Sequence, residues 1–189
     1  MRQLVLAASI GLLLATGCAS NETRTTAEPA AASAADTPTT TDATTSVRVA
    51  SVVPYDDEAK VAANIRQECP LGQQFSEFIA EYGASQGMQV VRQDAVEPGL
   101  EGRVLVVELT DAVSGGNAWI GHRKMTESRG TLYDNGEEVA SFTARRFSGG
   151  GAFAGFKGSC SVLGRTVQAM GRDVATWARL PTDGQHLGD

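Results

Sequence analysis

The stretch RVLVVELTDAV, residues 103–113, carries the strongest strand signal in the chain. Leu105, Val107 and Leu109 recur at every second position, which is the period of a strand that buries one face. Because the apolar run is nearly continuous, we expect this strand to lie in the centre of a sheet. The other elements should therefore pack around it.

Further strands are predicted at residues 46–53, 88–94, 122–133 and 137–147. Asn135 and Gly136 suit a tight hairpin turn between the last two. The glycine-rich segment at 114–121 predicts another turn, and DDEAK at 56–60 interrupts the first strand. Residues 61–68 fit either a short strand or a loop.

Two helices are predicted from apolar residues at helical spacing. The first runs from Pro70 to about Gln86, and Gly87 provides a left-handed stop. The second runs from about Ser159 to Leu180, before Pro181. Its apolar stripe consists of Leu163, Val167, Met170, Val174 and Trp177. Gly164 and Gly171 lie near this stripe, which predicts a close approach of the helix to the sheet.

This order of elements predicts an α+β domain, a two-layer sandwich at residues 46–180. We expect a mixed or antiparallel sheet of four to five strands with both helices on one face. The opposite face is left partly open, either solvated or available to a partner. Residues 181–189 are expected to be a frayed tail.

The first 17 residues form a secretory signal, with Arg2 followed by a short apolar run. The segment ATGC at 15–18 resembles the lipobox of bacterial lipoproteins, although Ala15 stands where that motif usually has Leu. The resemblance implies an acylated Cys18 that holds the protein at a membrane. The alternative is an ordinary secretory signal that is cleaved near Ala19.

In enteric lipoproteins an Asp after the modified cysteine retains the protein at the inner membrane, and Ala19 stands here instead. That resemblance favours the outer membrane. Residues 19–45 contain no Leu, Ile, Val, Met or aromatic residue, so with Cys18 they predict a lipidated, disordered tether. The net charge of −6 argues against nucleic acid as a partner.

Cys69 and Cys160 remain after Cys18 and both lie in the exported part, where an even pair predicts a disulfide. Each stands at the start of a predicted helix, so the bridge would hold the two helices side by side and parallel. The rival interpretation is a catalytic thiol. It is disfavoured because His122 and His186 are distant in sequence and there is no CxxC motif.

The stretch SGGGAFAGFKGSCSVLGR, residues 148–165, is interpreted as a structural joint, in which Phe153 and Phe156 pin the chain crossing. It lacks the GK[ST] of a phosphate-binding loop. Two distant histidines make no metal cluster, and we predict no cofactor and no metal. Trp119 is either a binding anchor for a partner or a cover for the end of the sheet.

The runs RQECPLGQQFSEFI and FSGGGAFAGFKGSCSVLGRTVQAMGRDVATW resemble a group of uncharacterised proteobacterial lipoproteins. More distantly, the arrangement is similar to penicillin-binding-protein activator lipoproteins and to auxiliary lipoproteins of envelope lipid transport. We therefore predict a non-enzymatic, lipid-anchored envelope protein that binds an envelope partner through Trp119, Phe153, Phe156 or the open sheet face. The alternatives are an accessory subunit of lipid transport and an enzyme that acts through Cys69 or Cys160.

Overall fold

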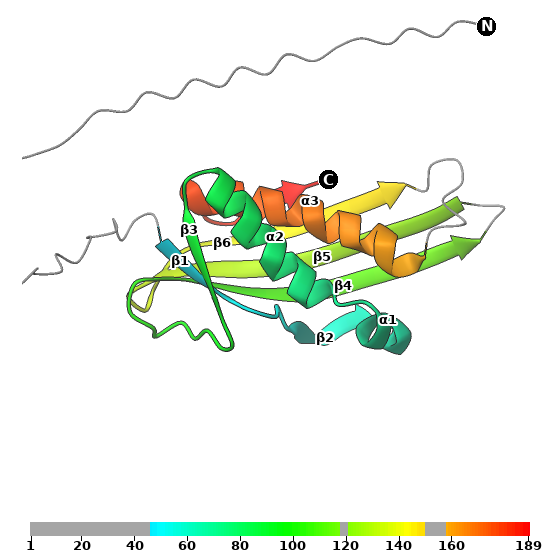
Figure 1. Ribbon diagram of the computed structural model, residues 1–189, viewed down its shortest axis with the longest axis horizontal. Helices are drawn as coiled ribbons and strands as arrows, with labels where there is room; N and C mark the ends of the chain where they lie inside the picture. The colour runs from blue at the N-terminus through cyan, green and yellow to red at the C-terminus, as the bar shows by residue number, and fades with distance from the viewer. Residues whose placement is uncertain (1–45, 118–120, 150–157) are drawn as a thin grey trace, which may run out of the picture. The chain divides into compact units, whose positions relative to one another are not determined.

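The computed structural model describes residues 46–117, 121–149 and 158–189 (Figure 1). The predictions for the signal, Cys18 and the tether fall outside these residues. The strands are β1 Ser46–Ala50, β2 Tyr55–Val61, β3 Gln89–Gln93, β4 Arg103–Asn117, β5 Gly121–Asp134, β6 Glu137–Gly149 and β7 Gln185–Gly188. The helices are α1 Ala63–Glu68, α2 Leu71–Ser85 and α3 Ser159–Arg179.

The strands form one mixed sheet in the order β3-β1-β4-β5-β6-β7, and β2 also pairs with β4. The long strands β4, β5 and β6 form an antiparallel meander. The pairs β1–β3, β1–β4, β2–β4 and β6–β7 are parallel. The α+β class is confirmed, with β4 inside the sheet as expected. The predicted four to five strands are too few, since the described residues form seven.

The two missed strands lie beside longer ones and lack a regular apolar alternation. DDEAK at 56–60 does not interrupt a strand but lies within β2, whose side chains are partly or fully exposed. The frayed tail predicted at 181–189 is also wrong, because Gln185–Gly188 pairs with β6. Each of these short strands gains its hydrogen bonds from a partner far away in sequence, and local periodicity does not report such bonds.

Two other local predictions need correction. The glycine-rich segment at 114–121 is not mainly a turn, since β4 continues to Asn117 and β5 begins at Gly121. Residues 61–68 contain the short helix α1, which was expected to be strand or loop. Only Ile65 of α1 is buried, so no apolar stripe marks this helix in the sequence.

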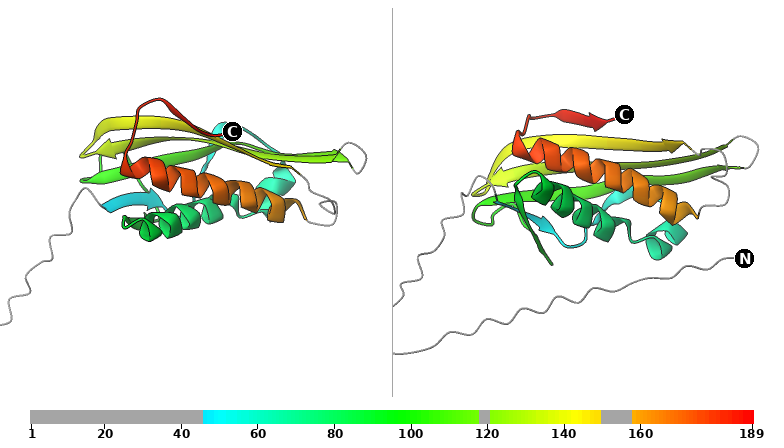
Figure 2. Two further views of the ribbon diagram at one scale, coloured as in Figure 1. Left: turned by 90° about the horizontal axis from the view of Figure 1, so that it is seen from above. Right: turned by 45° about the horizontal axis from the view of Figure 1, so that its top comes forward.

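α2 and α3 lie side by side on one face of the sheet and run in the same direction (Figure 2). The core between the layers contains Phe75 and Ile79 from α2, Val167 and Met170 from α3, and Leu105 and Leu109 from β4. This confirms the predicted two-layer arrangement. Within the residues that the structure describes, no helix has the length and apolarity needed to cross a membrane.

The end of α2 follows its predicted signal. Gly87 has a φ of 78°, and its N–H donates to the carbonyl of Ala84. The N–H of Met88 reaches back to the carbonyl of Gly83, which completes a Schellman motif. The left-handed stop at Gly87 is therefore confirmed.

The hairpin between β5 and β6 also forms as predicted. Asn135 and Gly136 both have positive φ, 51° and 86°, as a type I′ turn requires. The Asn135 side chain accepts a hydrogen bond from the N–H of Gly102, which attaches the turn to the chain before β4.

Cys69 and Cys160 form the predicted disulfide, with Cα atoms 5.0 Å apart and a sequence separation of 91. Cys69 follows α1 and stands just before α2, whereas Cys160 lies in the first turn of α3. The bridge therefore joins the residue two positions before α2 to the first turn of α3. In this form neither sulfur is a free thiol.

Candidate functional site

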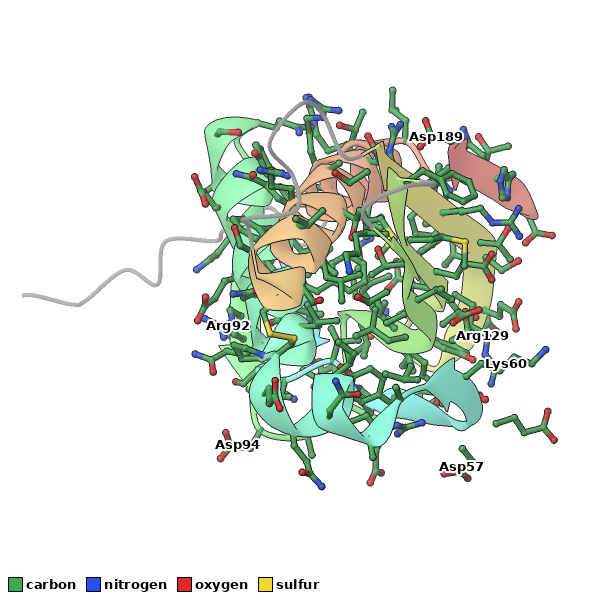
Figure 3. All side chains as sticks on the ribbon, turned by 90° about the vertical axis from the view of Figure 1, so that its right-hand side faces the viewer. Asp57, Lys60, Arg92, Asp94, Arg129 and Asp189 are labelled. Atoms are coloured by element: carbon green, nitrogen blue, oxygen red, sulfur yellow. A yellow bond between two sulfur atoms is a disulfide. The ribbon has the colours of Figure 1, made fainter. Side chains whose placement is uncertain are left out.

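The sheet has one face packed under α2 and α3 and an opposite face that no described helix covers (Figure 2). We call the second the uncovered face. A bulge in β4 adds one residue between Leu109 and Asp111. Glu108 before the bulge and Asp111 after it therefore lie on the same face of the sheet, and alternation continues from Asp111. The face carries Asp56, Lys60, Val106, Glu108, Asp111, Val113, Met125, Glu127, Arg129, Thr131, Thr143, Arg145 and Phe147. Figure 3 shows Lys60 and Arg129 on the side away from the helices.

Arg129 occupies the middle of this face and is held by two carboxylates. Its guanidinium donates to Glu108, directly opposite on β4, from Nη2 at 2.9 Å and from Nε at 3.0 Å. Asp56 of β2 accepts a further bond from Nη2. Across β6, the hydroxyl of Thr143 lies 2.9 Å from Nδ1 of His186. The exposed charge of Arg129 is thus already shared between two acidic partners.

The next row along the strands consists of Lys60, Asp111, Glu127 and Arg145, which we call the charged row. Two carboxylates face each other in its centre, with a cation on either side, and Arg145 bonds Glu127. Oδ1 of Asp111 is buried and accepts no hydrogen bond from the described residues. Burial, and then the neighbouring Glu127, raise the pKa of Asp111. The negative charges of Asp111 and Glu127 are therefore less well balanced by their neighbours than the positive charge of Arg129.

Val113, Met125 and Phe147 form the next row, directly opposite one another on β4, β5 and β6. We call it the apolar row. Val113 is 39% exposed and Phe147 is 45% exposed. The Arg145 guanidinium lies 6.0 Å from the centre of the Phe147 ring. This end of the face therefore presents exposed apolar side chains directly beside charged ones.

Two adjoining hollows make the rest of the face concave. The larger, about 390 Å³, is lined mainly by Glu108, Arg129, Thr131, Tyr133, Ser141 and Thr143. The second, about 340 Å³, is lined by residues that include Glu127, Arg145 and His186. Arg129 and Thr143 line both. Both linings expose polar and apolar surface in comparable amounts.

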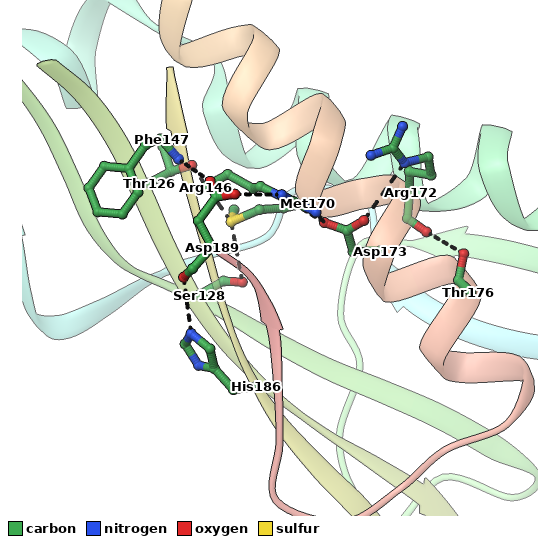
Figure 4. A network of polar contacts seen from close by, with 10 residues as sticks. All are labelled: Thr126, Ser128, Arg146, Phe147, Met170, Arg172, Asp173, Thr176, His186 and Asp189. Carbon is green, nitrogen blue, oxygen red and sulfur yellow. Dashed lines mark hydrogen bonds and ion pairs between the residues drawn. The ribbon is translucent and has the colours of Figure 1, made fainter. Parts of the chain in front are cut away.

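The C-terminal segment is bound to the sheet by carboxylates (Figure 4). Arg146 bridges Asp173 of α3 at 2.7 Å and Asp189 at 2.9 Å, and Asp189 also accepts the N–H of Phe147. Asp183 accepts the hydroxyl and the N–H of Ser141. The N–H of Phe147 lowers the pKa of Asp189, and the hydroxyl of Ser141 lowers that of Asp183.

Of the residues singled out in the sequence, the structure brings Cys69 and Cys160 together. Trp119, Phe153 and Phe156, the predicted partner-binding residues, lie outside the described residues, as does Cys18. The central part of the joint predicted at 148–165, residues 150–157, also falls outside them.

The uncovered face itself was expected, but its rows were not, because they depend on strand register. A second polar cluster, Ser114, Lys124 and Ser159, was missed entirely. These residues come from β4, β5 and α3, and no motif links them. The one local signal is that Lys124 has the same alternation as Thr126 and Ser128, both of which are buried beneath α3.

In comparisons with known proteins, no family model matches the chain, and no curated protein matches it. Solved structures give distant matches. A minor lipoprotein from Acinetobacter baumannii is 10% identical with a TM-score of 0.42, and the match covers 72% of this chain and 94% of that one.

Two further structures match at a similar level. The PelC dodecamer from Paraburkholderia phytofirmans is 16% identical with a TM-score of 0.42, covering 67% of this chain and 85% of that one. The lipoprotein GNA1162 from Neisseria meningitidis is 18% identical with a TM-score of 0.40, covering 69% and 98%. Similarities this distant carry no argument about what this chain does.

Proposed function

We propose that this chain is a lipid-anchored protein of the cell envelope, and that its domain binds an envelope protein through the uncovered face. The anchor rests on the secretory signal and the ATGC segment that ends at Cys18. The disulfide between Cys69 and Cys160 supports an oxidising compartment. Ala19 favours the outer membrane, with the domain on its periplasmic side.

The observation that carries the binding role is the apolar row, Val113, Met125 and Phe147, in which Val113 and Phe147 are exposed beside the charged row. Protein interfaces typically have an apolar or aromatic centre inside a polar rim. Here the rim is supplied by side chains that are held in place by ion pairs, such as Arg145 with Glu127. A fixed rim costs less entropy when a partner docks.

The charged row indicates the chemistry of the partner. Asp111 and Glu127 face each other, and Oδ1 of Asp111 is buried without a hydrogen-bond partner among the described residues. A basic side chain between them would relieve their repulsion. The apolar row lies two residues further along the same strands, about 7 Å away. The partner surface we propose therefore presents a basic and an apolar side chain about 7 Å apart.

A non-catalytic role fits the same contacts. Acid–base chemistry needs a group that is free to exchange a proton with a substrate. Arg129 is instead paired with Glu108, and Glu127 with Arg145, each directly across the sheet. The third hypothesis, an enzyme acting through Cys69 or Cys160, needs a thiolate, whereas these sulfurs are bonded together.

Photo-cross-linking in cells tests the proposal. A photoreactive amino acid replaces Val113 or Phe147 in the full chain, and the matched control replaces Gln73, which is exposed on α2. We expect a protein adduct from the first two sites, and a cross-linked peptide with a basic residue near an apolar one. Adding Asp111→Asn and Glu127→Gln should lower the yield several-fold.

Three outcomes would contradict the proposal. Equal adducts from Gln73 would show that the face has no preference. Adducts with peptides of this same chain would show an interface between copies. Lipid adducts would favour the accessory subunit of lipid transport instead.

A further inference from the structure

A lysine is buried between the sheet and the first turn of α3. Lys124 of β5 points to the helix layer and is 7% exposed. Its ammonium donates to the hydroxyls of Ser114 on β4 and of Ser159, the latter at 3.1 Å. The two hydroxyls lie 2.9 Å apart and bond to each other. Two observations show that this cluster carries a positive charge that is not balanced by the described residues, and a third concerns its access to solvent.

The first is that no salt bridge among the described residues involves Lys124. The segments that precede Lys124 and Ser159 in sequence, GNAWIGHR at 116–123 and GGGAFAGFK at 149–157, contain no Asp or Glu. Serine hydroxyls solvate an ammonium but do not neutralise it. Buried charges in proteins are normally paired, because burying one without a counter-charge is costly.

The second is the position of Ser159 as the first residue of α3, a helix of 21 residues. The N-terminus of such a helix carries a partial positive charge of about half an elementary unit. No acidic residue lies in the first turn of α3, and Gly158 provides no side-chain cap. The helix end therefore adds to the positive charge of Lys124 and does not offset it.

The third is access. Ser114 and Ser159 are partly exposed residues, so the cluster lies at the edge of the core, next to solvent-accessible surface. Each hydroxyl donates one hydrogen bond and is free to rotate toward a new acceptor. An oxyanion at this point would accept bonds from a hydroxyl and the ammonium, and charge-assisted bonds of this kind are the strong ones.

We propose that Ser114, Lys124 and Ser159 bind a phosphate group at the N-terminus of α3. The phosphate supplies the negative charge that the cluster lacks, and it belongs either to a small molecule or to a lipid headgroup. Because Lys124 faces the helix layer, this site is on the opposite side of the sheet from the uncovered face. The phosphate site and the protein-binding role can therefore be tested separately, and failure of one leaves the other unaffected.

Thermal unfolding of the full chain with its disulfide formed tests the site, with inorganic phosphate as the probe and ionic strength held constant with chloride. Phosphate stabilises folded proteins in general, so the informative quantity is the difference between variants. Lys124→Met removes the charge and keeps an unbranched apolar stem. Lys60→Met, at an exposed lysine of β2, is the control with the same change in net charge.

We expect phosphate at a tenfold excess over its Kd to raise the Tm of the wild type and of Lys60→Met by roughly 3–6 °C more than that of Lys124→Met. Ser159→Ala should weaken binding about tenfold or more, because a bond to a charged acceptor is lost. Soluble dihexanoylphosphatidylglycerol, used in the same assay, distinguishes the two sources. A larger shift with the lipid favours a headgroup, and a larger one with inorganic phosphate favours a small molecule.

An equal phosphate-dependent shift in all variants would overturn the proposal. If Lys124→Met fails to fold, ³¹P line broadening of phosphate by the wild type and by Ser159→Ala decides the question. Broadening that is the same with both proteins, or absent with the wild type, would also overturn it.

Discussion

Asp111 shows how a single residue on the uncovered face is held in an unfavourable state. Its pKa is raised by burial and by Glu127, so its ionised form is less favourable in the folded chain than in the unfolded one. The contribution of this group to stability is therefore greatest below the ordinary aspartate range. It is lost as the pH rises through the raised value.

We predict that Asp111→Asn raises the Tm at neutral pH by about 1–3 °C, because the amide carries no charge to desolvate. Asp57→Asn, at an exposed position of β2, is the control for net charge and should change little. Thermal unfolding at neutral and at acidic pH checks this. A variant that is less stable than the wild type at neutral pH would show that the carboxylate of Asp111 is needed for folding.

The pKa of Asp189 is shifted in the opposite direction from that of Asp111. Its pKa is lowered by the N–H of Phe147 and then by Arg146, so its contribution to stability is present above the ordinary aspartate pKa. That contribution disappears as the pH falls through the lowered value. We predict that the wild type exceeds Asp189→Asn in Tm at neutral pH and that the gap closes in acid. A gap that is constant with pH, or equal to that of the exposed control Asp94→Asn, would contradict this.

Among the elements, the contact between α2 and α3 depends on a glycine. A Cβ at Gly171 would lie 2.5 Å from the Cβ of Phe78 and 3.1 Å from its carbonyl carbon. The position of Gly171 near the apolar stripe predicted a close approach of α3 to the sheet, but at Gly171 the approach is to α2. Backbone atoms do not move aside as a flexible side chain does, so the helices would have to separate.

We predict that Gly171→Ala lowers the free energy of unfolding by about 1–3 kcal/mol, despite the better helix propensity of alanine. Gly164→Ala is the matched control, since its Cβ would meet only the flexible end of Gln74, at 3.2 Å. Urea unfolding measures both. Equal effects of the two substitutions would show that the contact with Phe78 is not tight.

The disulfide is the covalent link between these two helices. Cys69 is 2% exposed, so breaking the disulfide leaves a buried thiol and affects packing as well as chain entropy. We predict that Cys160→Ser lowers the free energy of unfolding by about 2–5 kcal/mol, and that reduction of the wild type has a similar effect. Unchanged urea midpoints after both treatments, with thiol loss or formation verified by mass, would argue against a stabilising role.

For the whole molecule, the C-terminal segment closes one edge of the sheet. β7 pairs with β6, Leu187 packs into the core, and Thr182 accepts the indole N–H of Trp177. An unpaired strand edge is a template for association with other chains.

We predict that deleting residues 181–189 lowers the free energy of unfolding by about 2–5 kcal/mol, through the loss of Leu187 and the ion pair of Asp189. It should also make the protein associate. Urea unfolding and light scattering check the two effects. A monodisperse truncated chain with the stability of the wild type would restore the interpretation of this segment as a tail.

The amino-acid sequence by itself determined the elements whose signals are local. The alternation in residues 103–113, the turn at Asn135 and Gly136, the stop at Gly87 and the apolar stripe of α3 each report which side of one element is buried. The disulfide between Cys69 and Cys160 was also predictable, because the number of cysteines and the oxidising compartment indicate it.

Only the tertiary structure decided what depends on partners far away in sequence. β2 and β7 are strands because β4 and β6 supply their hydrogen bonds, and their own side chains show no alternation. The charged row, the apolar row and the buried cluster at Lys124 arise from strand register and from the seating of α3. A register shifted by one residue would place these side chains on the other face, and no short stretch of sequence records that choice.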